Sequence, residues 1–328
     1  MKTIKFTILL LIALFSIVFL SSCDGDEDND LPYIDDEEFG LEIEGLTMAN
    51  YPVVDCSTSA EPLSNIIACK LLGYSYKWEK SITGTWGISS GLPFEFILQK
   101  LRTSQTHNSF INLIDNNVDI TISARKMSDD EKEYAKNAGI TLIETPIVLD
   151  AFIFVTNKNN PVESLTITQI QDIYTAKTRN WKEVGGSNHN INPYARIKNS
   201  GSQELMESMV MKDVEIPKWP VDHEPGPDLI SMGEVFSVLR SDVYGLGYTV
   251  YYYKEHMMRD DSIKSISING VYPDKNSIRT KEYPLYAEVY AVIRSDINKS
   301  SMAYKLYELL QTDASRDVIE ESGYVPYD

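Results

Sequence analysis

The sequence predicts an α/β fold with room for two domains. At 328 residues the chain is long enough for two ordinary domains, each with its own hydrophobic core. Apolar runs typical of buried strands alternate with segments whose apolar residues recur at helical spacing. Because alternating strands and helices are typical of sheets covered by helices, we expect an architecture with largely parallel sheets.

The predicted elements follow one another from residue 59 to residue 321. We expect strands at residues 118–123, 147–156, 246–253 and 285–293, and helices at 59–72, 129–137, 167–174, 228–239, 301–310 and 315–321. The segment 147–156 is apolar almost throughout, which predicts a strand buried on both faces. Four prolines between residues 217 and 227 predict an irregular loop.

The first 22 residues are typical of a secretory signal peptide. Two lysines precede an apolar run at residues 6–20, and small residues follow it. A membrane-spanning anchor is the alternative, but the run is shorter than the roughly 18 to 20 residues that a spanning helix needs. The Leu-Ser-Ser-Cys sequence ending at Cys23 resembles the bacterial lipoprotein signal, which implies that Cys23 is the lipidated first residue of the mature protein.

An acidic segment follows the lipidated cysteine, so that residues 23–45 form the anchor and its tether. Residues 24–45 contain eleven acidic and no basic side chains, a composition that stays solvated. The run resembles surface-export signals of some Gram-negative lipoproteins, whereas aspartate directly after the cysteine resembles an inner-membrane retention signal in others. Both a periplasm-facing and a surface-exposed lipoprotein of a Gram-negative-type cell envelope therefore remain open.

The charge of the whole chain excludes one class of partner. A net charge of −18 argues against nucleic acid, which needs a basic face to neutralise its phosphates. A small anion stays compatible with this charge, because a helix start binds it with backbone dipoles and one or two local cations. We therefore expect no nucleic-acid partner.

Two cysteines remain in the body of the chain, and we predict that both are free. If residues 59–72 are helical, Cys56 and Cys69 lie about 15 Å apart, well beyond the roughly 7 Å that a disulfide permits. Cys56 precedes a helix start, where its pKa could be lowered, but we expect a small packing residue there.

The first candidate site is Ser200-Gly201-Ser202 at a predicted helix start. Unpaired N–H groups at such an end favour an anion, glycine lets the backbone approach closely, and both hydroxyls can donate hydrogen bonds. Arg196, four residues upstream, can supply a planar pair of donors. An ordinary N-cap is the alternative interpretation of this motif.

Two further hydroxyl-rich turns also precede helical patterns. One contains Thr58 and Ser59, with Thr58 and Glu61 spaced as a capping box; the other contains Thr106 in a segment from residue 104 to 109. Three helix starts of this kind, with few acidic residues, predict one polar site assembled from distant segments.

Sequence segments spread over most of the body match one pattern in order. They are residues 55–63 (Asp-Cys-Ser-Thr-Ser-Ala-Glu-Pro-Leu), 118–120 with Ser123-Ala124-Arg125, 159–166, 173–177, 180–186 (Asn-Trp-Lys-Glu-Val-Gly-Gly), Arg196 with Ser200-Gly201-Ser202, 245–248 and 323–326 (Gly-Tyr-Val-Pro). In these segments the chain resembles the phosphate-binding proteins of ABC transporters, the PstS group of the type II periplasmic binding proteins.

The resemblance implies two lobes joined by a two-strand hinge that closes on ligand. Lobe I would comprise residues 46–150 and 247–328, and lobe II residues 151–246, with hinge strands at 150–155 and 247–251. Phosphate or a similar tetrahedral oxyanion would bind in the cleft to Thr58, Ser59, Thr106, Ser123, Arg125, Arg196, Ser200, Gly201 and Ser202. The expected partners are an ABC permease and, through Cys23, the membrane; we expect a monomer with no cofactor, no metal and no catalytic residue.

Departures from the family pattern concern the ligand. Cys56 stands where the family has glycine, and Ala60 replaces a hydroxyl. Choosing phosphate over sulfate requires an acceptor for the proton of HPO₄²⁻. Family members often use an aspartate next to the position of Ser123, where this chain has Ala124 and Arg125, so Asp55 and Glu61 are both left as candidates.

Two other functions compete with this interpretation. An enzyme would need a nucleophile with its base or a metal-ligand cluster, and the four histidines of the sequence form no pair at metal-ligand spacing. A surface lipoprotein of the same fold with a degenerate or different site, acting in interaction or sensing, is the alternative we retain. The tyrosines at 251–253 and the four tryptophans suggest packing more than a sugar platform.

Overall fold

The computed structural model describes residues 41–212, 214 and 228–327. The predicted signal peptide, the lipidation site Cys23, most of the acidic tether and the proline-marked loop at 217–227 lie outside the described residues. Within the described ranges, no helix is both long and apolar enough to span a membrane.

The largest sheet is mixed, and one long strand crosses it. Its order is β4-β1-β5-β12-β6-β9-β8, with bounds Leu101–Arg102, Val54–Cys56, Ile120–Ser123, Tyr286–Arg294, Leu142–Asn157, Gly245–Val250 and Asn192–Pro193. Strands β4, β1 and β5 are parallel, but β12 is antiparallel to both β5 and β6, and β6 is antiparallel to β9. The α/β class is confirmed, whereas the expectation of largely parallel sheets is wrong.

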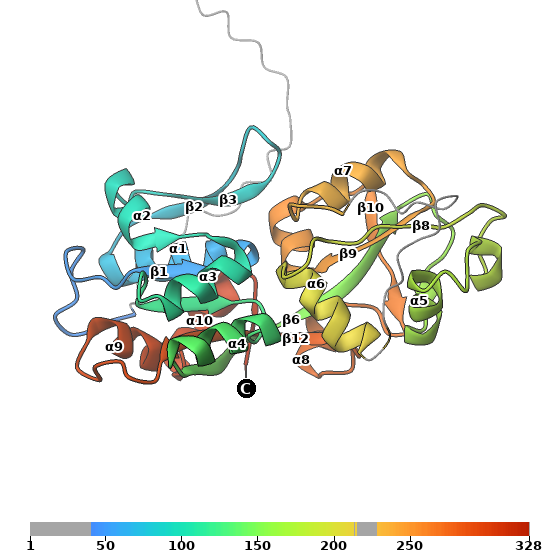
Figure 1. Cartoon of the computed structure of the whole chain (residues 1–328). Helices are drawn as coiled ribbons and strands as arrows, with labels where there is room; N and C mark the ends of the chain where they lie inside the picture. Colours follow the sequence, from blue (N-terminus) through green and yellow to red (C-terminus); the bar gives the residue numbers. More distant parts are fainter. Residues whose placement is uncertain (1–40, 213, 215–227, 328) are drawn as a thin grey trace, which may run out of the picture. The chain divides into compact units, whose positions relative to one another are not determined.

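Strand β6 belongs to both parts of this sheet. Residues 142–151 pair with β12, and residues 152–155 pair with β9. Its residues from Ile147 to Asn157 are all buried, as the apolar sequence predicts. We call the part with β1, β4, β5 and β12 the first lobe and the part with β8 and β9 the second lobe (Figure 1).

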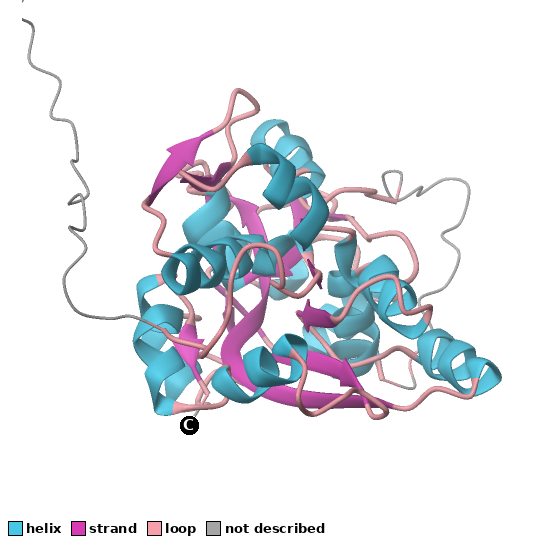
Figure 2. Cartoon of the chain, turned by 90° about the vertical axis from the view of Figure 1, so that its left-hand side faces the viewer, coloured by secondary structure: helices cyan, strands magenta, loops and turns pink. Residues whose placement is uncertain are grey.

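Helices flank the strands in both lobes, and Figure 2 shows strands lying between helices. Most helices match the predicted positions to within a few residues. The bounds are α1 Glu61–Leu72, α2 Phe94–Lys100, α3 Gln105–Ile114, α4 Asp129–Ala138, α5 Ile167–Tyr174, α6 Gly201–Leu205, α7 Glu234–Ser241, α8 Lys275–Arg279, α9 Met302–Leu309 and α10 Asp313–Glu321, with short helical segments η1 Thr58–Ala60, η2 Trp181–Val184, η3 Met206–Met211 and η4 Tyr253–Met258.

The remaining strands are short and complete the fold. Strand β10 (Ile263–Ser265) and strand β13 (Val325–Pro326) both pair with β6, and β7 (Ser164–Leu165) pairs with β11 (Ser267–Ile268). Strands β2 (Tyr76–Lys80) and β3 (Trp86–Ser90) form a separate hairpin.

Two local predictions are wrong for identifiable reasons. The strand expected at 246–253 ends at Val250, and Tyr253 begins the helical segment η4, because a short apolar run fits a buried helix as well as a strand. Thr58 and Glu61 do not form a capping box, since Thr58 starts the 3₁₀ turn η1 and Ala60 is the N-cap of α1.

Asp150 is a buried carboxylate in β6 where the two lobes meet. It is 3% exposed; Oδ1 accepts the N–H groups of Ala151 (2.8 Å) and Tyr252 (3.0 Å), while Oδ2 has no hydrogen-bond partner among the described residues. Burial raises the pKa of Asp150 to about 7, against the lowering effect of the two backbone N–H groups.

We expect Asp150→Asn to stabilise the protein at pH 8 relative to the wild type. A folded pKa above the unfolded one gives stability that is present below the unfolded pKa and is lost as pH rises toward 7. The gap between the two chains should therefore grow from about pH 4 to pH 7, to at most about 4 kcal/mol. Urea unfolding of both chains across this range measures it.

The exposed Asp261, replaced by asparagine, is the matched control and should follow the wild type. Parallel stability profiles for the wild type and Asp150→Asn would contradict the prediction.

Candidate functional site

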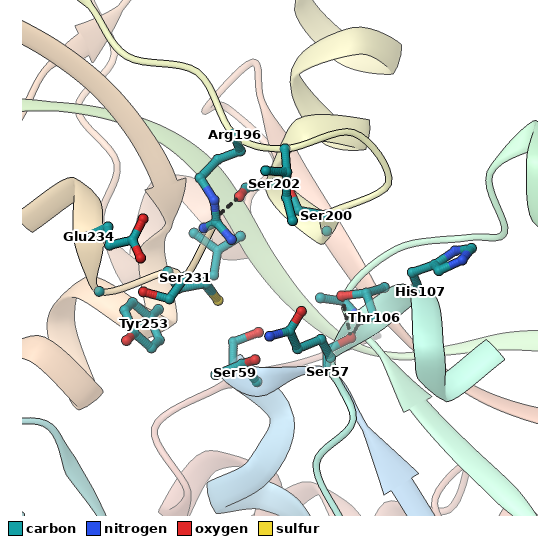
Figure 3. A pocket seen from close by; sticks show the side chains of 18 of the residues that line it. Ser57, Ser59, Thr106, His107, Arg196, Ser200, Ser202, Ser231, Glu234 and Tyr253 are labelled. Carbon is teal, nitrogen blue, oxygen red and sulfur yellow. Dashed lines mark hydrogen bonds between the residues drawn. The ribbon is translucent and has the colours of Figure 1, made fainter. Parts of the chain in front are cut away.

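A cavity of about 570 Å³ lies among segments of both lobes (Figure 3). The first lobe contributes the turn before α1, the β2–β3 turn, the start of α3 and Ala124. The second lobe contributes residues 196–202, the turn before α7 and side chains of β9 and η4. The segments from which we expected one polar site thus meet at a single cavity.

Seven of the nine predicted ligand residues line this cavity. They are Thr58, Ser59, Thr106, Arg196, Ser200, Gly201 and Ser202. Ser123 and Arg125 are not among the lining residues. The structure therefore brings the three hydroxyl-rich helix starts together, whereas the third predicted segment of the first lobe lines the cavity only through Ala124.

Ser57 joins three segments of the first lobe at the cavity wall. Its hydroxyl donates to Thr106 Oγ1 (2.9 Å) and accepts the N–H of Ala124 (2.9 Å). The side chain is 1% exposed, so these bonds fix the loop before α1 against the start of α3. We did not predict Ser57 as a site residue, although it lies in the hydroxyl-rich turn that contains Thr58.

Arg196 places a buried positive charge in the cavity wall. It is 6% exposed; Nε donates to the Leu229 carbonyl (2.9 Å), and Nη2 donates to the Ile230 carbonyl (3.0 Å). Within the described part of the chain, no carboxylate lies within 4 Å of its guanidinium, so only neutral groups contact it there. Burial lowers the pKa of Arg196, yet a guanidinium stays protonated in proteins.

The direction of this guanidinium is set on both sides. The two carbonyls hold one edge, and Nη1 lies 3.5 Å from Ser202 Oγ, as Figure 3 shows. The backbone N–H of Arg196 donates to the hydroxyl of Tyr248 (2.9 Å) on β9. A buried charge is costly unless something compensates it, which makes this wall a place for an anion.

The Ser200-Gly201-Ser202 motif lies against the first lobe. Ser200 is the N-cap of α6, and its hydroxyl accepts the N–H of Gln203 (3.3 Å), so the ordinary capping role is confirmed. A Cβ added at Gly201 would lie 2.6 Å from Thr106 Oγ1. Glycine is therefore needed at this position for the close approach between the two lobes.

Arg125 is engaged with protein groups instead of the cavity. Its guanidinium makes a two-pronged pair with Glu131 (2.7 and 2.9 Å), and Nη2 also donates to the Asn199 carbonyl (3.2 Å). Ser123 donates its hydroxyl to the Arg125 carbonyl (2.7 Å). Glu131 is the third residue of α4, and it reaches Arg125 only because this helix packs beside the segment 123–125. The Ser123-Ala124-Arg125 motif alone does not predict this pairing.

Neither candidate proton acceptor lines the cavity. Asp55 is fully buried, and its two oxygens accept the N–H groups of Cys56 and Ser104 and the side-chain amide of Asn112. Glu61 is also absent from the cavity lining. Glu234, which we did not predict, is the only carboxylate among the described lining residues, and its Oε2 accepts the Ile230 N–H (2.7 Å).

The cysteines behave as predicted. Both Cys56 and Cys69 are free and buried. The Cys56 thiol lies toward the Arg102 carbonyl (3.3 Å), and burial raises its pKa well above the usual range. Cys56 is therefore a packing residue, and it is not among the residues that line the cavity.

Comparison with known proteins places the chain in a family. A family model described as a PBP superfamily domain matches residues 99–310. The phosphate-binding protein PstS of Borreliella burgdorferi is 25% identical over 210 residues, 63% of this chain and 71% of that protein. PstS of Bacillus subtilis is 22% identical over 185 residues, 56% of this chain and 58% of that protein.

The fold has solved counterparts as well. The structure of an ABC-type phosphate transport receptor from Vibrio cholerae superposes with a TM-score of 0.56 at 19% identity, covering 84% of this chain and 99% of the other. Both curated relatives are binding proteins and not enzymes, in agreement with the prediction of a protein without covalent chemistry. Because the family model spans more than half of the chain, this protein belongs to the PBP superfamily, and the predicted two-lobed fold is confirmed.

Proposed function

We propose that this protein is an extracytoplasmic solute-binding protein that captures inorganic phosphate, or a similar tetrahedral oxyanion, and delivers it to an ABC permease. One observation carries the proposal: the buried guanidinium of Arg196 faces a hydroxyl-lined cavity and has no carboxylate within 4 Å in the described ranges. The names of the curated relatives, which are phosphate-binding proteins, support phosphate as the anion.

Several groups of the cavity wall have a part in holding the anion. Arg196 supplies the positive charge, and Thr58, Ser59, Thr106, Ser200 and Ser202 supply hydroxyl donors. Backbone N–H groups near Ser59 and Gly201 add donors at the starts of two helical segments. Neutral donors of this kind suit an oxyanion, because few acceptors of the protein compete with its oxygens for these N–H and O–H groups.

The donors come from both lobes, so ligand binding favours the closed arrangement. A ligand that touches both sides binds the closed form more tightly and shifts the population toward it. Ser123 and Arg125 serve this site indirectly in our proposal, because Arg125 holds the Asn199 carbonyl next to Ser200.

We propose a later second hinge crossing than the one predicted at 247–251. Strands β10 and β11 follow that segment, yet they pair with β6 at residues 155–157 and with β7. Further along the chain, just before β12, the Leu285 carbonyl accepts the N–H of Phe152 (2.9 Å), and the Tyr283 hydroxyl donates to the Phe152 carbonyl (3.1 Å). We therefore place the return to the first lobe near residues 283–286.

The route to the membrane is proposed from the sequence. The Leu-Ser-Ser-Cys ending and the acidic run behind it support lipid anchoring at Cys23, followed by a solvated tether to the binding domain. A lipid anchor would hold the binding domain close to the permease in the cell envelope.

We expect Arg196→Met to weaken phosphate binding at least tenfold, because a charge-assisted hydrogen bond contributes about 1.5 to 3 kcal/mol. Methionine keeps an apolar stem of similar length. Calorimetric titration of the full chain with phosphate, and then with sulfate, measures the change.

Arg240→Met is the matched control for this prediction. Arg240 also lines the cavity, but Asp260 neutralises it (Nε to Oδ2, 2.7 Å), so its loss should weaken binding much less. Equal affinities for the wild type and Arg196→Met would remove Arg196 from the site.

We expect Gly201→Ala to lower the free energy of unfolding by about 1 to 3 kcal/mol, because the new Cβ overlaps Thr106 Oγ1. Adding Thr106→Ala removes the overlapping atom. The double variant should therefore lose less stability than the two single losses predict together. Urea unfolding of the four chains measures this coupling, and additive losses would show that the predicted contact is absent.

A further inference from the structure

The β2–β3 hairpin, residues 76–90, reaches the ligand cavity from outside the main sheet. Among the residues that the structure describes, its two strands pair only with each other, and the region matched by the family model starts after it, at residue 99. Thr83 and Thr85, at its turn, line the cavity. Figure 1 shows the hairpin extending from the first lobe toward the second. We call residues 76–90 the hairpin cap.

One arginine of the second lobe holds the hairpin cap. The guanidinium carbon of Arg259 lies 5.2 Å from the ring centre of Trp78 and 4.4 Å from that of Trp86, both in the hairpin. Its Nε donates to the His256 carbonyl (3.0 Å), which fixes the direction of the side chain. A guanidinium packed over two indole rings is a favourable cation–π arrangement.

The backbone at Arg259 adopts a conformation that is unfavourable for a residue with a side chain. Arg259 ends η4 with φ 46° and ψ 49°, the left-handed conformation in which glycine or asparagine is usual. No ion pair joins Arg259 to a carboxylate within 4 Å in the ranges that the structure covers. The indole rings are therefore the groups that compensate its charge.

We propose that Arg259 is a positioning residue that holds the hairpin cap over the cavity and slows release of the bound anion. This inference rests on the proposed function. The tryptophans belong to the first lobe and Arg259 follows β9 of the second, so this cation–π contact joins the lobes beside the cavity mouth. The anion leaves when the lobes part, and parting them requires the guanidinium to leave both rings.

The first test measures release of radiolabelled phosphate from the full chain after rapid dilution. Arg259→Gln should release phosphate about tenfold faster than the wild type, since two cation–π contacts are lost. Arg259→Lys keeps a cation and should fall between the two. Arg279→Gln is the matched control, because Arg279 pairs with Glu320 on the surface away from the cavity, and it should release phosphate like the wild type.

A second measurement needs no ligand. Hydrogen exchange of the ligand-free chains should be faster across residues 76–90 in Arg259→Gln than in the wild type, with the rest of the first lobe unchanged. A merely structural role would instead lower the melting temperature and raise exchange throughout η4 and β9.

The outcomes separate this inference from the proposed function. If the wild type binds phosphate and Arg259→Gln releases it at the wild-type rate, the inference is overturned. If the wild type binds no phosphate, the proposed function fails, and unchanged exchange across residues 76–90 would overturn the positioning role as well. Faster exchange confined to the hairpin, together with faster release, supports it.

Discussion

The buried charge of Arg196 is the constraint on which the rest of the site depends. A guanidinium removed from water is costly unless other groups compensate it. Here two carbonyls, those of Leu229 and Ile230, orient the group without neutralising it. The backbone of Arg196 is in turn fixed by Tyr248 on β9, a buried strand paired with β6. The core of the second lobe thus holds a positive charge ready for an anion.

The first lobe contacts the loop that follows Arg196, and these contacts do not need a ligand. Lys198 Nζ lies 2.8 Å from Asp130 Oδ2, and Arg125 donates to the Asn199 carbonyl. The approach of Gly201 to Thr106 is close enough that a side chain would not fit. These contacts join the loop after Arg196 to α3 and α4, and they bring the hydroxyls of the two lobes around one cavity. The Lys198 pair is exposed and contributes little stability alone, so the buried Arg125 contact matters more to this edge.

Local sequence signals predicted the parts of the fold that depend on contacts between residues close in sequence, such as helix caps. Helix α5 has the expected bounds because Thr166 and Gln169 form a capping box at its start. The N-cap role of Ser200, which was the alternative interpretation of its motif, is likewise a local contact, with the Gln203 N–H. Prediction failed where contacts with distant residues determine the structure. The residues that follow Val250 form a helix instead of a strand. The antiparallel pairing of β12 has no periodic pattern in the sequence that would predict it.

The site shows the same division. Motif spacing singled out hydroxyls at helix starts and Arg196 upstream of one of them, and these residues line one cavity. Arg125, which it also singled out, does not line the cavity, because it pairs with Glu131 of α4. Motif spacing did not single out Glu234, because one glutamate in the first turn of a helix has an ordinary explanation, and only the packing of α7 brings it to the cavity.

The most direct test of the account is a crystal structure of the full chain grown with arsenate, a tetrahedral oxyanion whose arsenic can be located by anomalous scattering. The account predicts one strong anomalous peak in the cavity, within hydrogen-bonding reach of the Arg196 guanidinium and of hydroxyls from both lobes. A peak away from Arg196, or no peak in the cavity at saturating arsenate, would contradict it.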